Sequence, residues 1–321
     1  MIDRFPTDRE FEQAAHALAA GRLVAFPTET VYGLGADATN DHAVAAIYHA
    51  KGRPRFNPLI MHVADISAAQ IIGHLSEPAL QLAEAFWPGP LTIVVPRRPG
   101  AKLSSLATAG LETLAIRIPS HPVARRLLAA VGCPVAAPSA NISGRVSATS
   151  AAHVRADLGT SVAIILDAGP TQHGMESTIV DATGTTLRLL RPGAVTREAL
   201  AAASGSELLP ATRPEIDAPI APGQLASHYA PGVPLRMNAQ SVRPGEALLA
   251  FGPNIPAHDG PVINLSPSGN ITEAAISLFA AMRKLDATGC TGIAVMPVPE
   301  DGLGEAINDR LRRASAPRPQ G

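Results

Sequence analysis

Apolar and polar positions follow two distinct periods along the chain, one typical of helices and the other of strands. Thr7 and Glu10 form the sequence pattern of a capping box, which often starts a helix. Apolar residues then recur at helical spacing from Phe11 to Leu18, and Gly21 can end the helix in a left-handed conformation. The pattern therefore predicts a first helix between Thr7 and Gly21.

The same reasoning predicts that helices and short apolar strands alternate along the first two thirds of the chain. Further helices are expected at residues 41–50, 76–87, 121–131, 150–158 and 196–203. Strands are expected at residues 23–26, 58–63, 91–95, 114–118, 135–137, 162–166, 177–181 and 187–190. This alternation is typical of an α/β domain built around one sheet. Because several connections between residues 164 and 190 contain no helix, part of the sheet should be antiparallel.

The character of the chain changes near residue 205. Residues 205–234 contain six prolines and few periodic apolar positions, which predicts a linker too long for an ordinary connection inside a compact domain. Beyond it, strands are expected at residues 247–251, 262–265 and 292–298, and helices at 271–285 and 304–314. The chain should therefore consist of a domain at 1–204, a linker at 205–234 and a smaller α/β domain at 235–321.

Composition and charge exclude several classes of protein. The 321 residues are 46% hydrophobic and 17% charged, which is a globular composition, and the net charge of -1 lacks the basic footprint of many nucleic-acid binders. The two cysteines, Cys133 and Cys290, are too few for a disulfide framework or a zinc site. No apolar run approaches the ~20 residues that span a bilayer, and the first residues do not resemble a signal peptide. We expect a cytoplasmic protein with no membrane association.

One common motif is present in a weak form. Residues 33–38 match the glycine pattern of dinucleotide-binding turns. However, the next helix is expected to start only at Asp41, and Arg53 and Arg55 occupy the region in which that pattern requires an acidic residue. The sequence contains neither a P-loop nor the nucleophile elbow of hydrolases. The pattern at 33–38 therefore gives little support to a dinucleotide site.

Seven polar loops that follow strands contain the candidate chemistry. They are PTETVYGLG (27–35), KGRPRFNPLI (51–60), WPGPLT (87–92), TLAIRIPSHP (113–122), AAPSAN with SGRVS (136–147), ESTIVD (176–181) and LRPG (190–193). Ligands of open α/β sheets bind beyond strand ends, where such loops converge. Because cations and hydroxyl groups outnumber carboxylates in these loops, the expected ligand is an anion.

These motifs, in this order, resemble those of the threonylcarbamoyl-AMP synthase family, whose catalytic domain is called YrdC-like. The linker segment Ser227-His-Tyr-Ala-Pro231 and the small C-terminal unit resemble the two-domain members. The resemblance implies a YrdC-like twisted mixed sheet flanked by helices, with an open concave cleft, plus a smaller Rossmann-like α/β domain. It also implies a nucleotidyltransferase that condenses L-threonine, bicarbonate and ATP into threonylcarbamoyl-AMP and releases pyrophosphate.

The family reaction is the first step of threonylcarbamoyladenosine modification of tRNA. The resemblance implies that a separate transferase receives the product, so stable RNA binding by this chain is not expected. It also implies Mg²⁺ as the partner of ATP, and the sequence offers no side-chain cage for a metal. Two alternatives remain open at this stage, a double-stranded RNA-binding module and a transferase that uses carbamoyl phosphate.

The resemblance also implies the site residues. Threonine would contact Thr30, His62, Arg117, Ala137 and Ser177. ATP would contact Arg53, Asn57, Thr113, Ser139, Ser147, Arg191 and Tyr229. Because Tyr229 lies in the linker, the linker would act as a lid over the active site, although the tyrosine could instead only anchor the linker to the second domain.

Two of these positions also have arguments of their own. Strand alternation places Arg117 opposite Ile116 and Ile118, and the fork of a guanidinium suits the carboxylate of threonine. Lys51 and Arg53 lie on the turn that ends the second helix, where two cations could bind phosphate. The same two residues could instead serve only the helix dipole. The sequence alone does not identify His62 as a general base.

Overall fold

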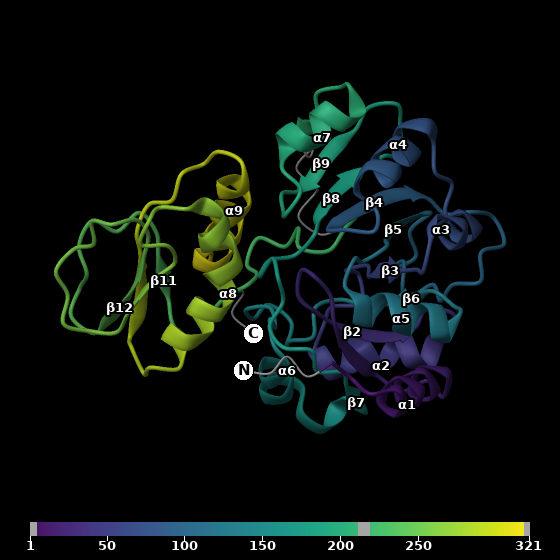
Figure 1. The fold of residues 1–321 in the computed structure, drawn as a ribbon, viewed down its shortest axis with the longest axis horizontal. Coiled ribbons are helices and arrows are strands. Elements are labelled where there is room, and N and C mark those ends of the chain that lie inside the picture. Colours follow the sequence, from purple (N-terminus) through teal and green to yellow (C-terminus); the bar gives the residue numbers. More distant parts are fainter. Residues whose placement is uncertain (1–4, 211–218, 318–321) are drawn as a thin grey trace.

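A ten-stranded mixed sheet forms the framework of the larger of two α/β units (Figure 1). The structure, a computed structural model, describes residues 5–210 and 219–317. Within these ranges the strand order is β10-β9-β8-β4-β5-β3-β6-β2-β1-β7. The strands are β1 (Val24–Pro27), β2 (Tyr32–Asp37), β3 (Ile60–His62), β4 (Leu91–Pro96), β5 (Thr113–Arg117), β6 (Val135–Ala136), β7 (Ile164–Ile165), β8 (Thr178–Asp181), β9 (Arg188–Arg191) and β10 (Leu209–Pro210).

The helices of this unit begin and end largely where their capping residues predict. They are α1 (Asp8–Ala19), α2 (Asp41–Lys51), α3 (Ile66–Ile72), α4 (Glu77–Phe86), α5 (Pro122–Val131), α6 (Ala151–Leu158) and α7 (Arg197–Ser204). Both hydrogen bonds of the capping box between Thr7 and Glu10 are present at the start of α1. Gly52 ends α2 in the left-handed conformation, with φ of 58°. The predicted alternation of helices and strands is thereby confirmed.

Parallel and antiparallel pairs are mixed in the large sheet. Strand β5 pairs antiparallel with β4 and parallel with β3, and β8 pairs antiparallel with β9. The expectation that part of the sheet is antiparallel is confirmed. The parallel register of β3 and β5 places His62 opposite Arg117, which brings two candidate site residues side by side at the ends of these strands.

The structure agrees with the weak support for a dinucleotide site at residues 33–38. Gly33 and Gly35 lie inside β2, which pairs antiparallel with β1, and not in a turn that opens a helix. A Cβ atom at Gly35 would lie 2.8 Å from the Phe26 ring and 2.9 Å from the Val135 side chain. Glycine is required here because neighbouring side chains pack over the strand, so the dinucleotide interpretation is wrong.

The segment expected as a linker at 205–234 contains some structure that the pattern did not predict. Its first part includes β10, whose two residues pair with β9 and extend the large sheet. Helix α3 and the short strand β11 (Leu235–Arg236) were also not expected. Residues 211–218 of the linker, and the chain ends at 1–4 and 318–321, lie outside the described residues.

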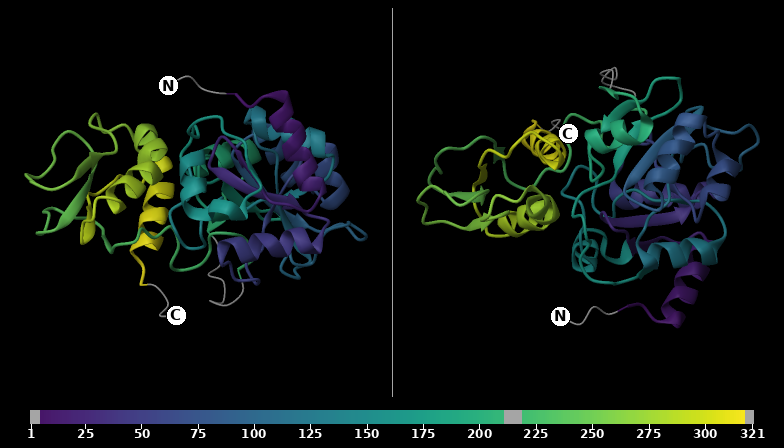
Figure 2. Two further views of the ribbon diagram at one scale, coloured as in Figure 1. Left: turned by 90° about the horizontal axis from the view of Figure 1, so that it is seen from below. Right: turned by 45° about the horizontal axis from the view of Figure 1, so that its top comes forward.

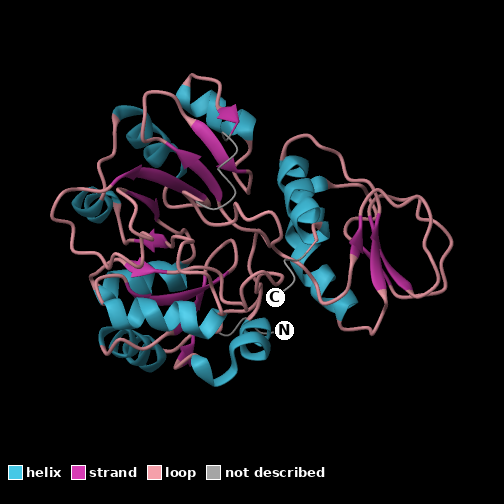
Figure 3. Ribbon diagram, turned by 180° about the vertical axis from the view of Figure 1, so that it is seen from behind, coloured by secondary structure: helices cyan, strands magenta, loops and turns pink. Residues whose placement is uncertain are grey.

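The smaller unit is a four-stranded parallel sheet with two long helices. Its strand order is β11-β14-β12-β13, with β12 at Glu246–Ala250, β13 at Val262–Asn264 and β14 at Gly292–Val295. The two helices are α8 (Ile271–Asp286) and α9 (Leu303–Ser315). Both lie between the small sheet and the larger unit, as the views from opposite sides show (Figures 1 and 3). The views in Figure 2 also place these helices against the larger unit. No helix among the described residues has the length and apolar character needed to cross a membrane.

Candidate active site

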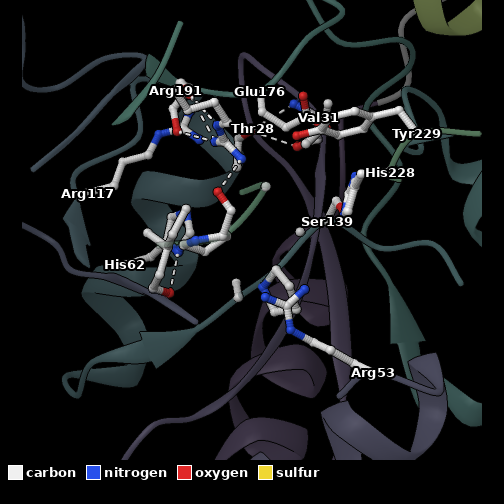
Figure 4. Close-up of a pocket in the computed structure, with 17 residues that line it drawn as sticks. Thr28, Val31, Arg53, His62, Arg117, Ser139, Glu176, Arg191, His228 and Tyr229 are labelled. Atoms are coloured by element: carbon white, nitrogen blue, oxygen red, sulfur yellow. Dashed lines mark hydrogen bonds between the residues drawn. The ribbon is translucent and has the colours of Figure 1, made fainter. Parts of the chain in front are cut away.

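The polar loops converge on one cavity in the larger unit, and the linker forms part of its wall (Figure 4). The lining residues are Thr28, Val31, Gly33, Arg53, Ile60, His62, Arg117, Ala137, Pro138, Ser139, Glu176, Ser177, Arg191, Pro222, Gly223, His228 and Tyr229. The cavity thus brings together residues that are far apart in the sequence, because several strand ends and the linker border it. Eight expected site residues are brought together, namely Arg53, His62, Arg117, Ala137, Ser139, Ser177, Arg191 and Tyr229.

The other expected site residues lie behind or beside this lining. The Thr30 hydroxyl accepts a hydrogen bond from Arg117 at 2.9 Å, and Asn57 is buried with no side-chain partner among the described residues. Thr113 starts β5, about 13 Å along the strand from Arg117, and alternation places both on the same face. Ser147 lies behind the wall, and its hydroxyl donates to Glu176, which is in the lining.

Lys51, expected as a phosphate contact, lies behind the residues that line the cavity. Its side chain is 2% exposed, and its ammonium donates to the backbone carbonyl of Ser139 at 2.6 Å and to that of Asn141. Burial and the nearby Arg53 charge lower the pKa of Lys51 well below its usual value. In the structure, Lys51 therefore holds the loop that carries Ser139 instead of lining the cavity.

Arg117 is held in the cavity wall by a buried ion pair. Its Nη2 lies 2.6 Å from Glu29 Oε1, its Nη1 donates to Thr30 Oγ1 at 2.9 Å and its Nε donates to the Gly89 carbonyl at 3.3 Å. Glu29 is fully buried and Arg117 is 3% exposed. Since a guanidinium has five N–H donors and three are used, two remain for a carboxylate in the cavity.

Glu29 is the buried partner that fixes this geometry. Its second oxygen accepts the backbone N–H of Ser120 at 3.0 Å and that of His121 at 3.4 Å, at the start of α5. Burial alone would raise the pKa of the Glu29 carboxyl, but the Arg117 charge and these hydrogen bonds outweigh it and lower that pKa. A charged Glu29 therefore orients Arg117. Glu29 directly precedes Thr30 in the sequence and was not among the expected site residues.

Two further arginines make the cavity cationic. Arg53 donates to the carbonyls of Asn57 at 3.3 Å and Pro58 at 2.9 Å, and burial lowers its pKa to about 10, so it stays charged at neutral pH. Arg191 donates to the carbonyl oxygen of Ser177 at 2.9 Å and to its hydroxyl at 3.2 Å. Figure 4 shows these guanidinium groups approaching the cavity from different walls. Buried cations in this number favour a polyanionic ligand.

Glu176 is the one carboxylate among the lining residues, and both of its oxygens are engaged. One oxygen accepts a hydrogen bond from the Ser147 hydroxyl, and the other lies 3.0 Å from the Nε of Arg310. Arg310 belongs to α9 of the smaller unit. Glu176 begins the ESTIVD motif (176–181), but the sequence assigned it no function. No local signal in the sequence pointed to Arg310.

The linker closes one side of the cavity with His228 and Tyr229. Tyr229 is fully buried, has a φ of 60°, and stacks on Phe279 of α8 with 5.6 Å between ring centroids. Its neighbour His228 lines the same wall. Burial and the surrounding cations, Arg53 first among them, lower the pKa of His228 well below its usual value. His228 belonged to the quoted linker motif but had not been selected as a site residue.

His62 should make unfolding pH-dependent in a defined direction. Burial, followed by the Arg117 charge, lowers its pKa to about 3, whereas the unfolded chain has a histidine pKa near 6.5. Between these values the unfolded chain binds more protons, so this contribution to stability is complete above pH 6.5 and is lost as the pH falls.

We therefore expect the unfolding free energy of the protein to depend more steeply on pH than that of His62→Gln between pH 5 and 6. The difference should approach about 1.4 kcal/mol per pH unit, which corresponds to one proton. Urea unfolding at several pH values measures both slopes. Equal slopes would show that His62 is not kept neutral by the fold.

Metal-binding groups are sparse in the described part of the chain. No cluster of three or more His, Cys, Asp or Glu side chains that could hold an ion occurs there. Glu176, the carboxylate at the cavity, is already engaged with Ser147 and Arg310. Mg²⁺ commonly binds through one or two carboxylates and substrate phosphates. These residues therefore do not fit a site in which the protein itself supplies most of the ligands.

The fold and cavity define an α/β protein that binds an anionic substrate in a cationic cavity. A family model named Sua5_yciO_yrdC and described as "Telomere recombination" matches residues 16–193, and a model described as the C-terminal domain of threonylcarbamoyl-AMP synthase matches residues 195–316. The chain belongs to the Sua5–YciO–YrdC family and carries this second domain in addition.

Relatives match nearly the full length of the chain. The threonylcarbamoyl-AMP synthase of Bacillus subtilis is 40% identical over 97% of this chain and 94% of its own. The threonylcarbamoyl-AMP synthase of Pyrococcus abyssi is 40% identical over 95% of this chain and 94% of its own. The crystal structure of P. abyssi Sua5 complexed with L-threonine superposes with a TM-score of 0.90 and 37% identity, covering 97% of this chain and 96% of that one. The predicted fold class and family resemblance are confirmed.

Proposed function

We propose that this protein is an enzyme that condenses L-threonine, bicarbonate and ATP into threonylcarbamoyl-AMP and releases pyrophosphate. The observation that carries the proposal is that two arginines line one cavity. Glu29 holds Arg117, and Ser177 holds Arg191. The full-length relatives named threonylcarbamoyl-AMP synthase and the Sua5 structure complexed with L-threonine support it. The product is the substrate of a downstream transferase that modifies tRNA, and we place the reaction in the cytoplasm.

The threonine end of the cavity lies around Arg117. The two unused N–H donors of its guanidinium pair with the threonine carboxylate in a charge-assisted contact. His62 lies opposite Arg117 on the neighbouring strand and is neutral at pH 7 because burial lowers its pKa. Thr30, Ala137 and Ser177 complete this end of the site.

The nucleotide end contains the remaining cations. Arg53 and Arg191 bind phosphate oxygens and offset the charge of the triphosphate, with Ser139 beside them in the lining. Asn57, Thr113 and Ser147, which lie behind or beside the lining, complete the proposed ATP contacts. Threonine and bicarbonate form the carbamate with loss of water. The carbamate then attacks the α-phosphorus, and the bond to the β-phosphate breaks as pyrophosphate leaves. Positioning and electrostatic stabilisation supply most of the rate enhancement in such transfers. Mg²⁺ would accompany ATP, and the phosphate oxygens would have to supply most of its ligands, because the described residues offer no carboxylate cluster for it.

Labelled bicarbonate tests this reaction directly. Incubation of the enzyme with ATP, L-threonine and ¹³C-bicarbonate should give an adenylate whose mass is one unit higher than with ordinary bicarbonate. A carbamoyl-phosphate-using transferase would incorporate no label from bicarbonate. An adenylate that contains threonine but no label would contradict the proposal.

The linker acts as a lid that excludes water from the intermediate. Tyr229 lines the cavity and is held against α8, and the backbone N–H of Ala230 donates to Gly144 beside the Ser147 loop at 2.8 Å. We expect Tyr229→Ala to raise the KM for ATP about tenfold, because the ring closes the nucleotide side of the cavity. Steady-state pyrophosphate release measures this change.

Tyr229→Phe is the matched control for the lid. It keeps the ring and the stacking on Phe279, and the Tyr229 hydroxyl has no hydrogen-bond partner among the described residues. We expect Tyr229→Phe to change the KM for ATP less than threefold. A Tyr229→Ala protein with the KM and rate of the unsubstituted enzyme would show that the linker is an anchor and not a lid.

A further inference from the structure

A fully buried arginine of the smaller unit reaches the wall of the active site. Arg310, on α9, has 0% of its surface exposed. Its Nε donates to Glu176 Oε2 at 3.0 Å, and its Nη1 donates to the carbonyl of Pro192 at 2.7 Å. Glu176 lines the cavity and Pro192 directly follows Arg191, so one side chain of α9 joins two loops that form the cavity.

Through Glu176, Arg310 also determines how Ser147 is presented. The Ser147 hydroxyl donates its one proton to Glu176 Oε1, so only its lone pairs are available to a further partner. The opposite oxygen of Glu176 is neutralised by Arg310. Without Arg310, the buried Glu176 carboxylate would have no positive partner and would face the space that the phosphates enter. The negative charges of the carboxylate and of the phosphates would then repel each other.

A second arginine of the smaller unit braces the same loop from its backbone side. Arg283, on α8, donates to the carbonyl of Ser147 at 3.2 Å and to that of Val146, and it pairs with Asp157 at 2.6 Å. Ser147 is therefore held from two helices of the smaller unit, by Arg283 through its carbonyl and by Arg310 through Glu176. Because both arginines act on the loop that carries Ser147, the contact between the two units fixes this part of the cavity wall in addition to holding the units together.

Helix α9 holds the linker as well. The Arg310 guanidinium carbon lies 5.2 Å from the centroid of the Tyr229 ring, within the range of a cation–π contact. One turn later, the Arg313 carbonyl accepts the backbone N–H of His228 at 3.2 Å, and Arg313 Nη1 donates to the Leu225 carbonyl at 2.8 Å. The helix that fixes Glu176 thus also fixes the linker residues that close the cavity.

We propose that Arg310 is a positioning residue for the nucleotide site, and that the smaller unit completes this site through it. Arg310 acts through Glu176 on Ser147 and through its cation–π contact on Tyr229. The inference rests on the proposed function, which assigns ATP to this side of the cavity. It gives the smaller unit a direct role in substrate binding, beyond adding stability to the chain.

The test compares full-length protein with Arg310→Gln, Glu176→Gln and the double variant. Calorimetric titration with Mg·ATP gives the Kd of ATP, and pyrophosphate release gives KM for each substrate. We expect Arg310→Gln to raise the Kd and KM of ATP at least tenfold and the KM of threonine less than twofold. Because the two residues act in series, the double variant should bind ATP no more weakly than Arg310→Gln alone.

Two matched controls separate positioning from docking of the smaller unit. Arg312, on the same helix as Arg310, forms an exposed ion pair with Glu300 that Arg312→Gln removes. Glu305→Gln removes the ion pair of 2.6 Å with Arg197 between the two units. Both should leave the Kd of ATP within twofold. A loss with Glu305→Gln equal to that with Arg310→Gln would overturn the proposal, because any loosening of the interface would then suffice.

A conservative variant keeps the test decisive if Arg310→Gln fails to fold. Arg310→Lys retains the charge opposite Glu176 but cannot also reach Pro192 with a planar fork. It should fold and raise the Kd of ATP at least threefold, with threonine unaffected. An unchanged Kd in this variant would overturn the proposal. If the unsubstituted protein itself does not bind ATP, the proposed function fails first, and that result is distinct from a loss confined to Arg310 variants.

Discussion

Replacing Arg117 by alanine is expected to raise the KM for L-threonine at least 100-fold and the KM for ATP less than threefold. The guanidinium is oriented by Glu29 at 2.6 Å and Thr30 at 2.9 Å, so its free donors are fixed before the substrate arrives. Losing a buried, charge-assisted contact of this kind costs about 3–5 kcal/mol, and each 1.36 kcal/mol is a factor of ten. Initial rates of pyrophosphate release against each substrate measure both constants.

The same substitution has a second effect on the fold. Arg117→Ala leaves the buried Glu29 carboxylate without its partner, so the unfolding free energy should fall by about 3–5 kcal/mol. Arg117→Lys keeps a charge beside Glu29 and should fold, yet raise the KM for threonine about tenfold, because an ammonium cannot form the fork.

A surface arginine provides the control for this prediction. Arg126→Ala removes an ion pair with Asp8 whose side chains are 44% and 84% exposed, and it should change neither KM more than twofold. If Arg117→Ala raised the KM values for ATP and threonine equally, the assignment of Arg117 to the threonine carboxylate would be wrong.

Replacing Arg53 by alanine is expected to give the opposite selectivity, with the KM for ATP raised about 30-fold or more and that for threonine less than threefold. Arg53 lines the cavity, and hydrogen bonds to the carbonyls of Asn57 and Pro58 hold its guanidinium in place. Burial lowers its pKa only to about 10, so the charge is retained when the triphosphate enters. Removing one partner of a desolvated charge pair commonly costs about 2–5 kcal/mol.

Arg55 is a matched control in the same loop. It is exposed and lies two residues beyond Arg53, outside the cavity lining. Arg55→Ala should therefore change the KM for ATP less than twofold, because a screened surface charge contributes little. Equal losses in the two variants would mean that the loop attracts ATP through its net charge, without a specific contact from Arg53.

Local features of the sequence predicted the parts of the fold that depend on neighbouring residues. The capping box at Thr7 and the left-handed end at Gly52 are short-range signals, and both helices begin and end close to them. The strand β2 was missed because Gly33 and Gly35 resemble turn residues. Their actual role depends on Phe26 and Val135, which pack against the strand from other elements.

The candidate site depends even more on contacts between residues that are far apart in the sequence. The motifs led to Arg117, but its partner Glu29 lies 88 positions away, and no local pattern shows that the two pair. The link between Glu176 and Arg310 spans 134 positions and two structural units. The sequence shows that Lys51 lies on a cationic turn. It does not show that the Lys51 ammonium donates to two backbone carbonyls, those of Ser139 and Asn141. Only the packed structure reveals these long-range partners.

Pyrophosphate release from ATP, measured with L-threonine and bicarbonate each omitted in turn, tests the central claim most directly. In the proposed site, Arg117 holds the threonine carboxylate while Arg53 and Arg191, which line the same cavity, hold the phosphates of ATP, so release should require both substrates. Omission of either one should reduce the rate to the background of ATP hydrolysis. Pyrophosphate release that continues without threonine and bicarbonate would contradict the account, because the protein would then only hydrolyse the nucleotide.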